Sequence, residues 1–198
     1  FWNKFKIMKK IITLIVLVFS SSIFAQIADS AENISPLLIG EKIPTLILEN
    51  SNGEKISTDK IFNKKTVLVI YRGGWCPYCN SQLSEMQEIE SQIIELGYTV
   101  VAISPDAPSF LKQTEDKKEL KYQLYSDSDG KFSETLGIAF KKDKPKLDKY
   151  SEGKNPGFLP VPTVYVINEK QKIDFLYINP DYSVRLSGKL LLAVLKNL

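Results

Sequence analysis

The chain has 198 residues, of which 43% are hydrophobic and 25% are charged, as expected of one folded domain with extra segments at its ends. Its formal net charge is only +3, and the lysines are spread along the chain rather than gathered in a basic stripe, so nucleic acid is not expected as a partner. Histidine is absent, which excludes Ser-His and Cys-His catalytic pairs and any histidine-ligated metal site.

The N-terminus has the three-part pattern of a targeting segment. Residues 8–10 supply a short positive region, 11–19 form an almost continuous apolar run, and small residues lead to a cleavage site after Ala25. This pattern predicts a secretory signal peptide over 1–25, with residues 1–7 upstream of the true start. A retained membrane anchor is the alternative, but the apolar run is shorter than the roughly 20 residues of a spanning helix. We therefore expect an exported protein, periplasmic or otherwise extracytoplasmic, with no stable membrane anchor after cleavage.

The rest of the chain alternates strand-like and helix-like patterns after an extended lead-in over residues 26–37. A hairpin turn is predicted at Asn52-Gly53, followed by a central strand over 66–71 that is buried on both faces. The predicted strands are 45–49, 55–57, 66–71, 98–103, 121–125, 163–167 and 172–178, and the predicted helices run from the cysteines to 96 and over 108–119, 131–136 and 183–198. The lysine-rich stretch 141–155 has no periodicity and is predicted to be a loop or insertion.

This order of elements predicts an α/β fold over residues 38–198, with a central mixed β-sheet flanked by helices and an N-terminal β-hairpin. Open α/β sheets usually place their sites at the carboxyl ends of the strands. The chain has two cysteines, Cys76 and Cys79, and both directly follow the central strand. The sequence therefore places its chemistry at this pair.

The spacing of the two cysteines suits reversible disulfide chemistry. At the start of a helix, unpaired backbone N–H groups favour a thiolate, and residues three apart bring their sulfurs within bonding reach. Cys76, nearer the helix start and expected to be the more exposed, is the candidate nucleophile, and Cys79, one turn deeper, is the candidate resolving thiol. Trp75 is expected to shield one side, Pro77 to restrict the ring that closes, and Arg72 to help stabilise the thiolate.

Two other interpretations of the cysteine pair are weaker. A structural disulfide across so short a loop would remove little chain entropy, roughly 2 kcal/mol, and structural disulfides usually join distant segments. A structural zinc site takes four Cys or His ligands, and this chain offers two thiols and no histidine. We therefore expect neither a metal nor another cofactor.

A proline opens the strand that is predicted to lie beside the central one. Pro162 stands between Val161 and Thr163, and its missing N–H confines it to the start of a strand. The general preference of X–Pro bonds favours an ordinary trans bond, and only the combination with the cysteine pair favours a cis bond here. The sequence predicts that Pro162 and Thr163 lie across the sheet from the cysteines.

Three segments carry motifs of a known family. Residues 71–80 read YRGGWCPYCN, residues 126–131 read SDSDGK, and residues 159–163 read LPVPT. Each resembles a signature of the thioredoxin superfamily and, more closely, of its peroxiredoxin-like branch, the alkyl hydroperoxide reductase/thiol-specific antioxidant family. The resemblance covers roughly residues 38–197. It implies a thioredoxin-like fold, an antioxidant role, and a cis Pro162 in contact with the active-site sulfurs.

The chain departs from that family at the positions that activate peroxide. Peroxiredoxins carry Thr or Ser three positions before the peroxide-attacking cysteine, and an arginine on a following strand. Aligned on the motif, Cys79 takes the peroxide-attacking position, Cys76 stands where the Thr is expected, and Val161 stands where the arginine is expected. Both substitutions weaken a peroxidase interpretation.

Three further positions bear on the resemblance. Thioredoxins keep a buried acid six residues before the first cysteine, and this chain has Ile70 there. Glu85 and Asp106 are candidate replacements, but both are expected to be ordinary surface residues. Residues 181–185 match a DYxxR run of the branch, to which no role is assigned.

Three functions are compatible with these observations. The leading hypothesis is thiol–disulfide exchange by Cys76 and Cys79, with protein thiols, protein disulfides or a thioredoxin-type reductant as partners. The alternative is a thiol-dependent peroxidase that reduces hydrogen peroxide or organic hydroperoxides with the same cysteines. The third is a non-catalytic module that binds a metal through two thiolates, for which the chain has no methionine or histidine cluster.

Overall fold

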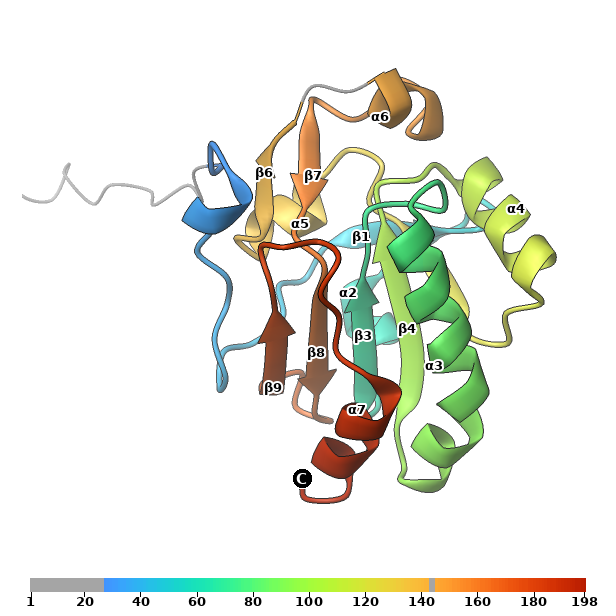
Figure 1. The fold of residues 1–198 in the computed structure, drawn as a ribbon, viewed down its shortest axis with the longest axis vertical. Coiled ribbons are helices and arrows are strands. Elements are labelled where there is room, and N and C mark those ends of the chain that lie inside the picture. Colours follow the sequence, from blue (N-terminus) through green and yellow to red (C-terminus); the bar gives the residue numbers. More distant parts are fainter. Residues whose placement is uncertain (1–26, 143–144) are drawn as a thin grey trace, which may run out of the picture.

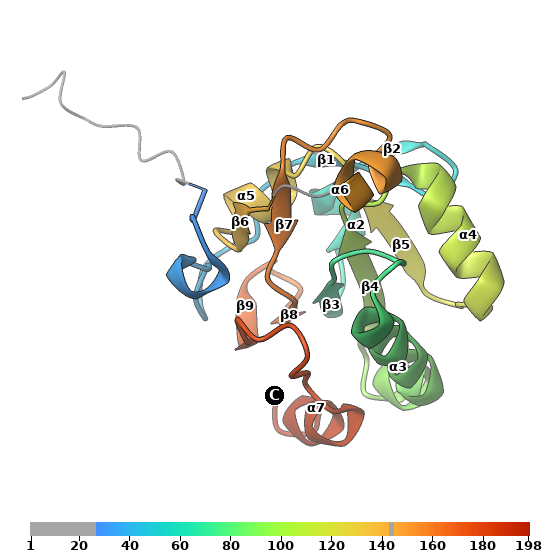
Figure 2. The ribbon, with the colours of Figure 1, turned by 45° about the horizontal axis from the view of Figure 1, so that its top comes forward.

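The computed structural model describes residues 27–142 and 145–198, and the signal peptide predicted over 1–25 lies outside these ranges. A seven-stranded sheet crosses the molecule, and helices cover both of its faces (Figure 1, Figure 2). None of the helices in the described ranges is long and apolar enough to cross a membrane. The sheet combines parallel and antiparallel neighbours, so the predicted α/β fold with a mixed, helix-flanked sheet is confirmed.

The strands follow the order β2-β1-β5-β4-β3-β8-β9 across the sheet. They are β1 (Ile47–Asn50), β2 (Lys55–Ser57), β3 (Thr66–Ile70), β4 (Thr99–Ser104), β5 (Gln123–Ser126), β8 (Thr163–Ile167) and β9 (Ile173–Ile178). The helices are the short 3-10 helix η1 (Ala31–Asn33), α2 (Thr58–Ile61), α3 (Pro77–Glu95), α4 (Pro108–Lys118), α5 (Lys131–Thr135), α6 (Pro145–Tyr150) and α7 (Gly188–Leu195). The predicted N-terminal hairpin is present as β1 and β2, and Gly53 in its turn has a φ of +81°.

Strand β3 leads to the cysteines and is buried along its whole length. It pairs in parallel with β4 and antiparallel with β8, so that Ile70 lies between Ile103 and Thr163. A strand with neighbours on both edges and helices on both faces is expected to be apolar, and residues 67–70 of this one are. The loop after β3 therefore leaves from the middle of the sheet.

Alternate residues of the central strands build two separate cores. On one face, Val67 belongs to the same cluster as Leu83 of α3 and Leu191 of α7. On the other face, Leu68 of the same strand belongs to a cluster that includes Phe132 of α5. Because successive side chains of a strand point to opposite faces, one strand serves both cores. The cysteines belong to the core on the α3 and α7 side.

Helix α3 begins at the cysteine motif. Pro77 occupies its first turn, where a missing N–H costs no hydrogen bond, and Cys76 is the residue just before the helix. The helix ends at Glu95, and Gly97 then turns the chain with a φ of +86°, a conformation that glycine adopts without strain. The helix predicted from the cysteines to residue 96 is therefore present, with the expected glycine after its end.

The stretch 141–155, predicted to be a loop or insertion, contains one short helix between two flanking strands. Strand β6 (Ala139–Lys141) pairs antiparallel with β7 (Phe158–Pro160) in a separate two-stranded sheet, and α6 lies between them in the chain. The carbonyl of Tyr150 accepts the Ala107 N–H at 2.7 Å, which holds α6 against the start of α4. The loop prediction is wrong for residues 145–150, because a helix of 6 residues is too short to show a hydrophobic period among so many lysines.

The last helix begins later than predicted. Asp181 forms a turn in which its carboxylate accepts the Ser183 N–H at 2.9 Å and the Ser183 hydroxyl at 2.7 Å, and this bonding competes with a helix. Ser187 then caps α7 by accepting a backbone N–H of its first turn at 3.3 Å. Residues 179–187 form an irregular link between β9 and α7, here called the C-terminal connection.

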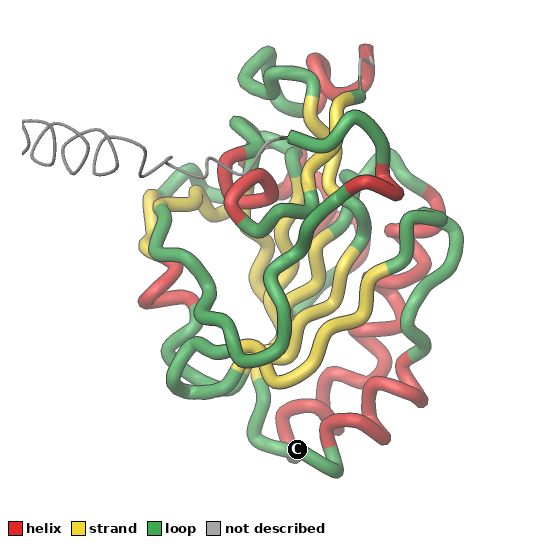
Figure 3. Tube along the Cα trace, turned by 90° about the vertical axis from the view of Figure 1, so that its left-hand side faces the viewer, coloured by secondary structure: helices red, strands yellow, loops and turns green. Residues whose placement is uncertain are grey.

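The lead-in continues without a strand to residue 46, which Figure 3 shows as a long green stretch in front of the strands, and residues 40–43 of this segment run beside β9. Apart from η1 it has no helix, as predicted. The Gly40 N–H donates to the Ile173 carbonyl at 2.7 Å, and the Ile173 N–H donates to the Glu41 carbonyl at 2.9 Å. The segment thereby supplies partners to backbone groups of β9, a strand at the edge of the sheet.

Candidate active site

Cys76 and Cys79 lie where the carboxyl end of β3 meets the start of α3. Both are free thiols, and their exposed fractions are 1% for Cys76 and 0% for Cys79. Cys76 is therefore not exposed to solvent, although Cys79 is the more deeply buried of the two. Both side chains are enclosed in a site that the C-terminal connection completes with an arginine and an aromatic ring.

The two thiols differ strongly in acidity. The pKa of Cys76 is lowered to about 6, chiefly because the Cys79 thiol donates a hydrogen bond to its sulfur; burial opposes this effect, and the Cys79 N–H, Arg72 and Arg185 add to it. The pKa of Cys79 is raised because the Cys76 sulfur holds its proton, because the thiol is buried, and because the Cys76 thiolate repels a second negative charge. The pair therefore ionises at Cys76 and keeps its remaining proton on Cys79.

Arg185 reaches the pair from the C-terminal connection. Its Nη2 lies 3.4 Å from the Sγ of Cys79, and its Nη1 donates to Oε1 of Gln82 at 3.0 Å. Its Nε donates to the Tyr182 carbonyl at 2.8 Å, so all three nitrogens of the guanidinium have partners. The geometry fixes a positive charge directly against the deeper sulfur.

Arg72, the residue two positions after β3, is 7% exposed and lies between two aromatic rings. Its guanidinium carbon is 5.4 Å from the centre of the Trp75 ring and 4.1 Å from the centre of the Tyr182 ring. Tyr182 also makes an edge contact with Tyr78, with 5.7 Å between the ring centres. These cation–π and aromatic contacts hold the C-terminal connection over the start of α3.

Asp106 anchors the loop that precedes Cys76. Its Oδ2 accepts the Gly74 N–H at 2.7 Å and the Ser104 hydroxyl at 3.2 Å. The side chain is 1% exposed, and burial raises its pKa to about 7, against the lowering effect of these two hydrogen bonds. The expectation of an ordinary surface residue is wrong, because the parallel pairing of β3 and β4 brings the loops that follow them together at one edge of the sheet.

Glu85 also departs from that expectation. It is half-buried on α3, and its Oε1 accepts the Gly188 N–H at 2.6 Å. A carboxylate is favourable at this position because the start of a helix carries partial positive charge. Glu85 therefore ties α7 to α3 and helps to set the path of the C-terminal connection.

Pro162 and Thr163 lie at the start of β8, beside the end of β3, with Thr163 paired to Ile70. No cis peptide bond occurs in the described residues, so the expected cis bond before Pro162 is wrong. The Val161 N–H donates to the Ile138 carbonyl at 2.9 Å, and the Thr163 hydroxyl donates to the Val161 carbonyl at 2.8 Å. The extended backbone makes these bonds with the trans isomer, which X–Pro bonds prefer by roughly 0.5–1 kcal/mol.

A cavity of about 310 Å³ reaches Arg72 and the start of β8, although neither cysteine lines it. Arg72, Pro162 and Tyr182 line one part of it, and Lys141 and Lys142 line another. The cavity therefore joins the arginine next to Cys76 to a surface that a substrate can reach.

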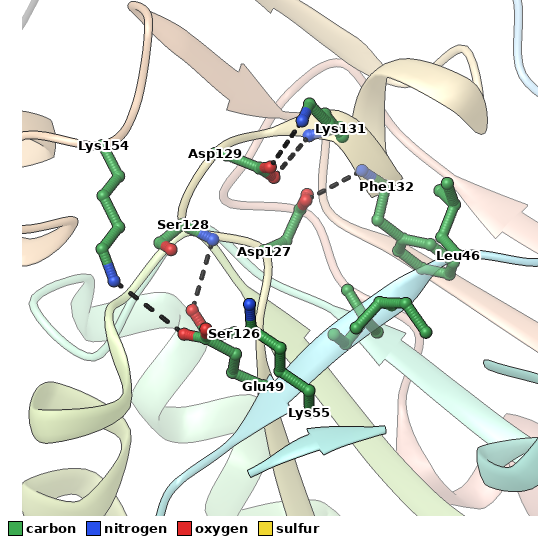
Figure 4. Close-up of a pocket in the computed structure, with 12 residues that line it drawn as sticks. Leu46, Glu49, Lys55, Ser126, Asp127, Ser128, Asp129, Lys131, Phe132 and Lys154 are labelled. Carbon is green, nitrogen blue, oxygen red and sulfur yellow. Dashed lines mark hydrogen bonds and ion pairs between the residues drawn. The ribbon is translucent and has the colours of Figure 1, made fainter. Parts of the chain in front are cut away.

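A second cavity, of about 390 Å³, lies between β1, β5 and the start of α5 (Figure 4). The ion pair Glu49–Lys154 (3.9 Å) and the ion pair Asp129–Lys131 (3.3 Å) neutralise charges along its wall. Asp127 turns its carboxylate toward the N-terminal N–H groups of α5, at 2.8 and 2.9 Å. Neither the cysteines nor the residues that contact them line this cavity, so it is not the candidate site.

The described residues contain no group of three or more Cys, Asp or Glu side chains placed to hold a metal ion. The two sulfurs alone supply two ligands, whereas a structural zinc site takes four. The groups at this site that can act as nucleophiles are its two thiols.

The family model for the AhpC/TSA family matches residues 39–176, a range that contains the cysteine pair and the start of β8. The chain belongs to the AhpC/TSA family. The resemblance inferred from the three motifs is thereby confirmed, and so is the thioredoxin-like fold of the peroxiredoxin branch. As a member of this family, the chain is an oxidoreductase that acts on peroxide or on thiols.

Similar proteins carry names from both kinds of chemistry. A Haemophilus influenzae protein named "Putative peroxiredoxin bcp" is 34% identical over 104 residues, which cover 52% of this chain and 67% of that protein. Thiol-disulfide oxidoreductase ResA of Halalkalibacterium halodurans is 25% identical over 173 residues, which cover 87% of this chain and 83% of that protein. The names of these relatives therefore do not decide whether this AhpC/TSA member acts on a peroxide or on a disulfide.

Solved peroxiredoxin structures share the fold. Reduced Prx3 of Vibrio vulnificus in complex with H2O2 superimposes with a TM-score of 0.71 at 17% identity, over 81% of this chain and 96% of that one. A peroxiredoxin-like protein of Aquifex aeolicus gives a TM-score of 0.66 at 15% identity, over 86% and 95% of the two chains. At these identities the similarity establishes the fold.

The structure adds Arg185, Tyr182 and Tyr78 to the residues around the pair. One signal in the sequence could have pointed to the first: the chain has two arginines among its 26 basic residues, Arg72 and Arg185, and both lie at the cysteines. The DYxxR run contains Tyr182 and Arg185, but its distance from the cysteine motif in the sequence hides their contact in the fold.

Proposed function

We propose that this AhpC/TSA member catalyses thiol–disulfide exchange, with Cys76 as the nucleophile and Cys79 as the resolving thiol. The observation that carries the proposal is the pair of free thiols at the start of α3, with Arg185 Nη2 3.4 Å from Cys79 Sγ. The pKa shifts agree with it, downward to about 6 for Cys76 and upward for Cys79. Thiolates, not thiols, attack disulfides. In a pair that is ionised at one sulfur and protonated at the other, the thiolate can attack a disulfide and the thiol remains available for the second step.

The proposed reaction proceeds in two balanced steps. The Cys76 thiolate attacks one sulfur of a substrate disulfide, forms a mixed disulfide, and expels the other substrate sulfur as a thiolate that takes a proton from water. Cys79 then loses its proton and attacks the Cys76 sulfur, which forms the Cys76–Cys79 disulfide and expels the second substrate thiolate. The pair is oxidised by two electrons, and the substrate disulfide is reduced to two thiols.

Access to Cys76 requires movement around the site. With 1% of the residue exposed, a protein disulfide cannot reach the sulfur in the enclosed conformation. Tyr182 of the C-terminal connection lies on Arg72 and Tyr78, the two residues that its ring contacts at this site. We propose that the C-terminal connection moves to admit the substrate, and Arg72, Trp75, Pro77, Pro162 and Thr163 form the surroundings in which the substrate binds.

A thiol-dependent peroxidase is the second candidate, favoured by relatives that are named peroxiredoxin. In that reaction one thiolate, of Cys76 with its lower pKa or of Cys79 at the aligned position, attacks a peroxide oxygen and becomes a sulfenic acid. The other oxygen leaves with a proton from solvent as water or an alcohol. The second thiol of the pair then displaces the sulfenic hydroxyl as water and closes the same disulfide. A small peroxide needs a smaller opening than a protein disulfide, which suits the enclosed site.

Two measurements on the same variants separate the candidates. An insulin-reduction assay reports disulfide exchange, and a stopped-flow trace with hydrogen peroxide reports peroxide reduction. Thiol–disulfide exchange predicts insulin reduction that Cys76→Ser abolishes, together with peroxide oxidation no faster than that of a free thiol. Fast stoichiometric oxidation by peroxide without insulin reduction would select the peroxidase, and full insulin activity in Cys76→Ser would refute the assignment of the nucleophile.

We further propose that the protein is exported and works on extracytoplasmic thiols or disulfides. The support is the leader predicted over 1–25, followed by a lead-in of 26–37 and the catalytic domain over 38–198. N-terminal sequencing of the mature protein tests this directly. A mature chain that begins at Gln26 supports export, and an intact leader in a cytoplasmic fraction contradicts it.

A further inference from the structure

Arg185 is in direct contact with the deeper sulfur, and several hydrogen bonds hold it there. The guanidinium places Nη2 3.4 Å from Cys79 Sγ while Nη1 and Nε donate to the Gln82 side chain and the Tyr182 carbonyl. The segment that carries it is tied down next to the site by the bond from the Gly188 N–H to Glu85. A planar guanidinium can hold all these partners at once, which a lysine ammonium on a flexible stem cannot.

The two sulfurs need a cation at different times. In the resting pair, the negative charge is on Cys76, and both arginines lower the pKa of that thiol. Once Cys76 is part of a mixed disulfide it is uncharged, and it no longer repels a charge on Cys79. Cys79 must then ionise inside a buried site, where an isolated thiolate is unfavourable. Arg185 already touches this sulfur and is in place to stabilise the new charge.

We propose that Arg185 is a catalytic residue of the resolving step, in which it stabilises the Cys79 thiolate that attacks the Cys76 sulfur and closes the disulfide. This inference rests on the proposed function and deepens it. The proton of Cys79 leaves to water, the Cys76–Cys79 bond forms, the bond from Cys76 to the substrate sulfur breaks, and the substrate leaves as a thiolate. Arg185 exchanges no proton and no electron.

Stopped-flow oxidation of the reduced protein by 4,4′-dithiodipyridine, a neutral disulfide, resolves the two steps. The first equivalent of thiopyridone reports attack by Cys76, and the second reports closure by Cys79. We expect Arg185→Gln to slow the second phase by about tenfold or more near neutral pH and to shift its pH midpoint upward, since one pKa unit corresponds to a tenfold change in thiolate population. The first phase should change by less than about threefold, because Arg72 and the Cys79 thiol still act on Cys76.

Three variants separate charge from structure. Arg185→Lys keeps the positive charge and should recover part of the lost rate. Gln82→Ala removes one anchor of the guanidinium but leaves its charge, so it should slow the second phase less than Arg185→Gln does. Lys189→Gln removes an exposed charge of α7 and should leave both phases unchanged. A Cys79→Ser protein should release one equivalent, which assigns the second phase to Cys79.

Different results would refute the role of Arg185 and the proposed thiol–disulfide exchange. A second phase within about twofold of wild type in Arg185→Gln overturns the role of Arg185, because that loss is far below the tenfold effect of one pKa unit. Equal slowing by Lys189→Gln also overturns it. If the wild-type protein releases no second equivalent, or if Cys76→Ser keeps a normal first phase, the proposed function itself fails, and the role of Arg185 fails with it.

Discussion

The low pKa of Cys76 depends first on the thiol of its partner, and removing that thiol gives a sharp test. The largest contribution to the lowering, to about 6, is the hydrogen bond that the Cys79 thiol donates to the Cys76 sulfur. Cys79→Ala deletes the donor, so we expect the Cys76 pKa to rise by at least about one unit toward the roughly 8.5 of a free thiol. Cys79→Ser is the matched control, because its hydroxyl can donate in place of the thiol.

The titration midpoint is a better measure of this effect than the rate at one pH. At pH 7 a thiol with a pKa of 6 is about 90% ionised and one with a pKa of 8.5 is about 3% ionised, a difference of about thirtyfold. A thiolate with a higher pKa is also a better nucleophile. With a Brønsted coefficient near 0.4–0.5, its rate constant for attack on a disulfide is about tenfold larger, which offsets most of the thirtyfold loss of thiolate. The rates at pH 7 would then differ by only about threefold, although the midpoints differ clearly.

Thiolate absorbance in the ultraviolet, followed from pH 4 to pH 10, measures the midpoint directly. The wild type should show a first step near pH 6, Cys79→Ser a step close to it, and Cys79→Ala a step at higher pH. The reasoning is refuted if the alanine and serine variants titrate together at the wild-type midpoint. Cys76→Ala provides the reverse check: with its neighbour's sulfur removed, the pKa of Cys79 should fall, because that sulfur is the first cause of its raised value.

Three further predictions concern the loop, the covering residues and the distant cavity. Gly73→Ala should lower the free energy of unfolding, measured by urea titration, by about 2–4 kcal/mol, because Gly73 has a φ of +136° and an added methyl group would overlap the Trp75 indole and lie 2.7 Å from Asp106 Oδ1. An unchanged urea midpoint would contradict this. Tyr182→Ala removes a cation–π contact worth about 0.5–1 kcal/mol and should make iodoacetamide alkylation of Cys76 about two- to fivefold faster. An alkylation rate no faster than wild type would show that another group controls access to Cys76. Asp127→Ala should lower the free energy of unfolding by about 1–3 kcal/mol, because two N–H groups at the start of α5 lose their acceptor. Asp129→Ala, at an exposed position nearby, should lower it by less than about 0.5 kcal/mol, and equal losses in the two variants would refute the capping role of Asp127.

The sheet could be predicted from the sequence because its strands have strong local patterns. The run 66–71 is apolar and β-branched, and the Asn52-Gly53 turn has a well-known geometry, so both elements appear where expected. The cysteine pair could be placed for the same reason, since a strand, a glycine turn and Pro77 define the start of a helix within a few residues.

The surroundings of the pair could not be predicted because they come from segments far apart in the chain. Arg185 is separated from Cys79 by 106 residues, and Asp106 from Gly74 by 32. Whether an acid such as Asp106 is buried depends on which loops meet at the edge of the sheet, and local residue patterns do not contain that information. The burial of Cys76 was missed for the same reason, because the connection that completes its site belongs to the other end of the sequence.

The contact between the C-terminal connection and the pair makes the last helix a reporter of redox state. Arg185 binds the reduced Cys79 sulfur, and Glu85 binds the first turn of α7, so the packing of this helix is thermodynamically linked to the thiols. Whichever oxidation state holds Arg185 more tightly also protects the chain end from local unfolding. Limited proteolysis of the last turns, compared between dithiol and disulfide forms, would therefore read out the oxidation state at a site that the protease never contacts.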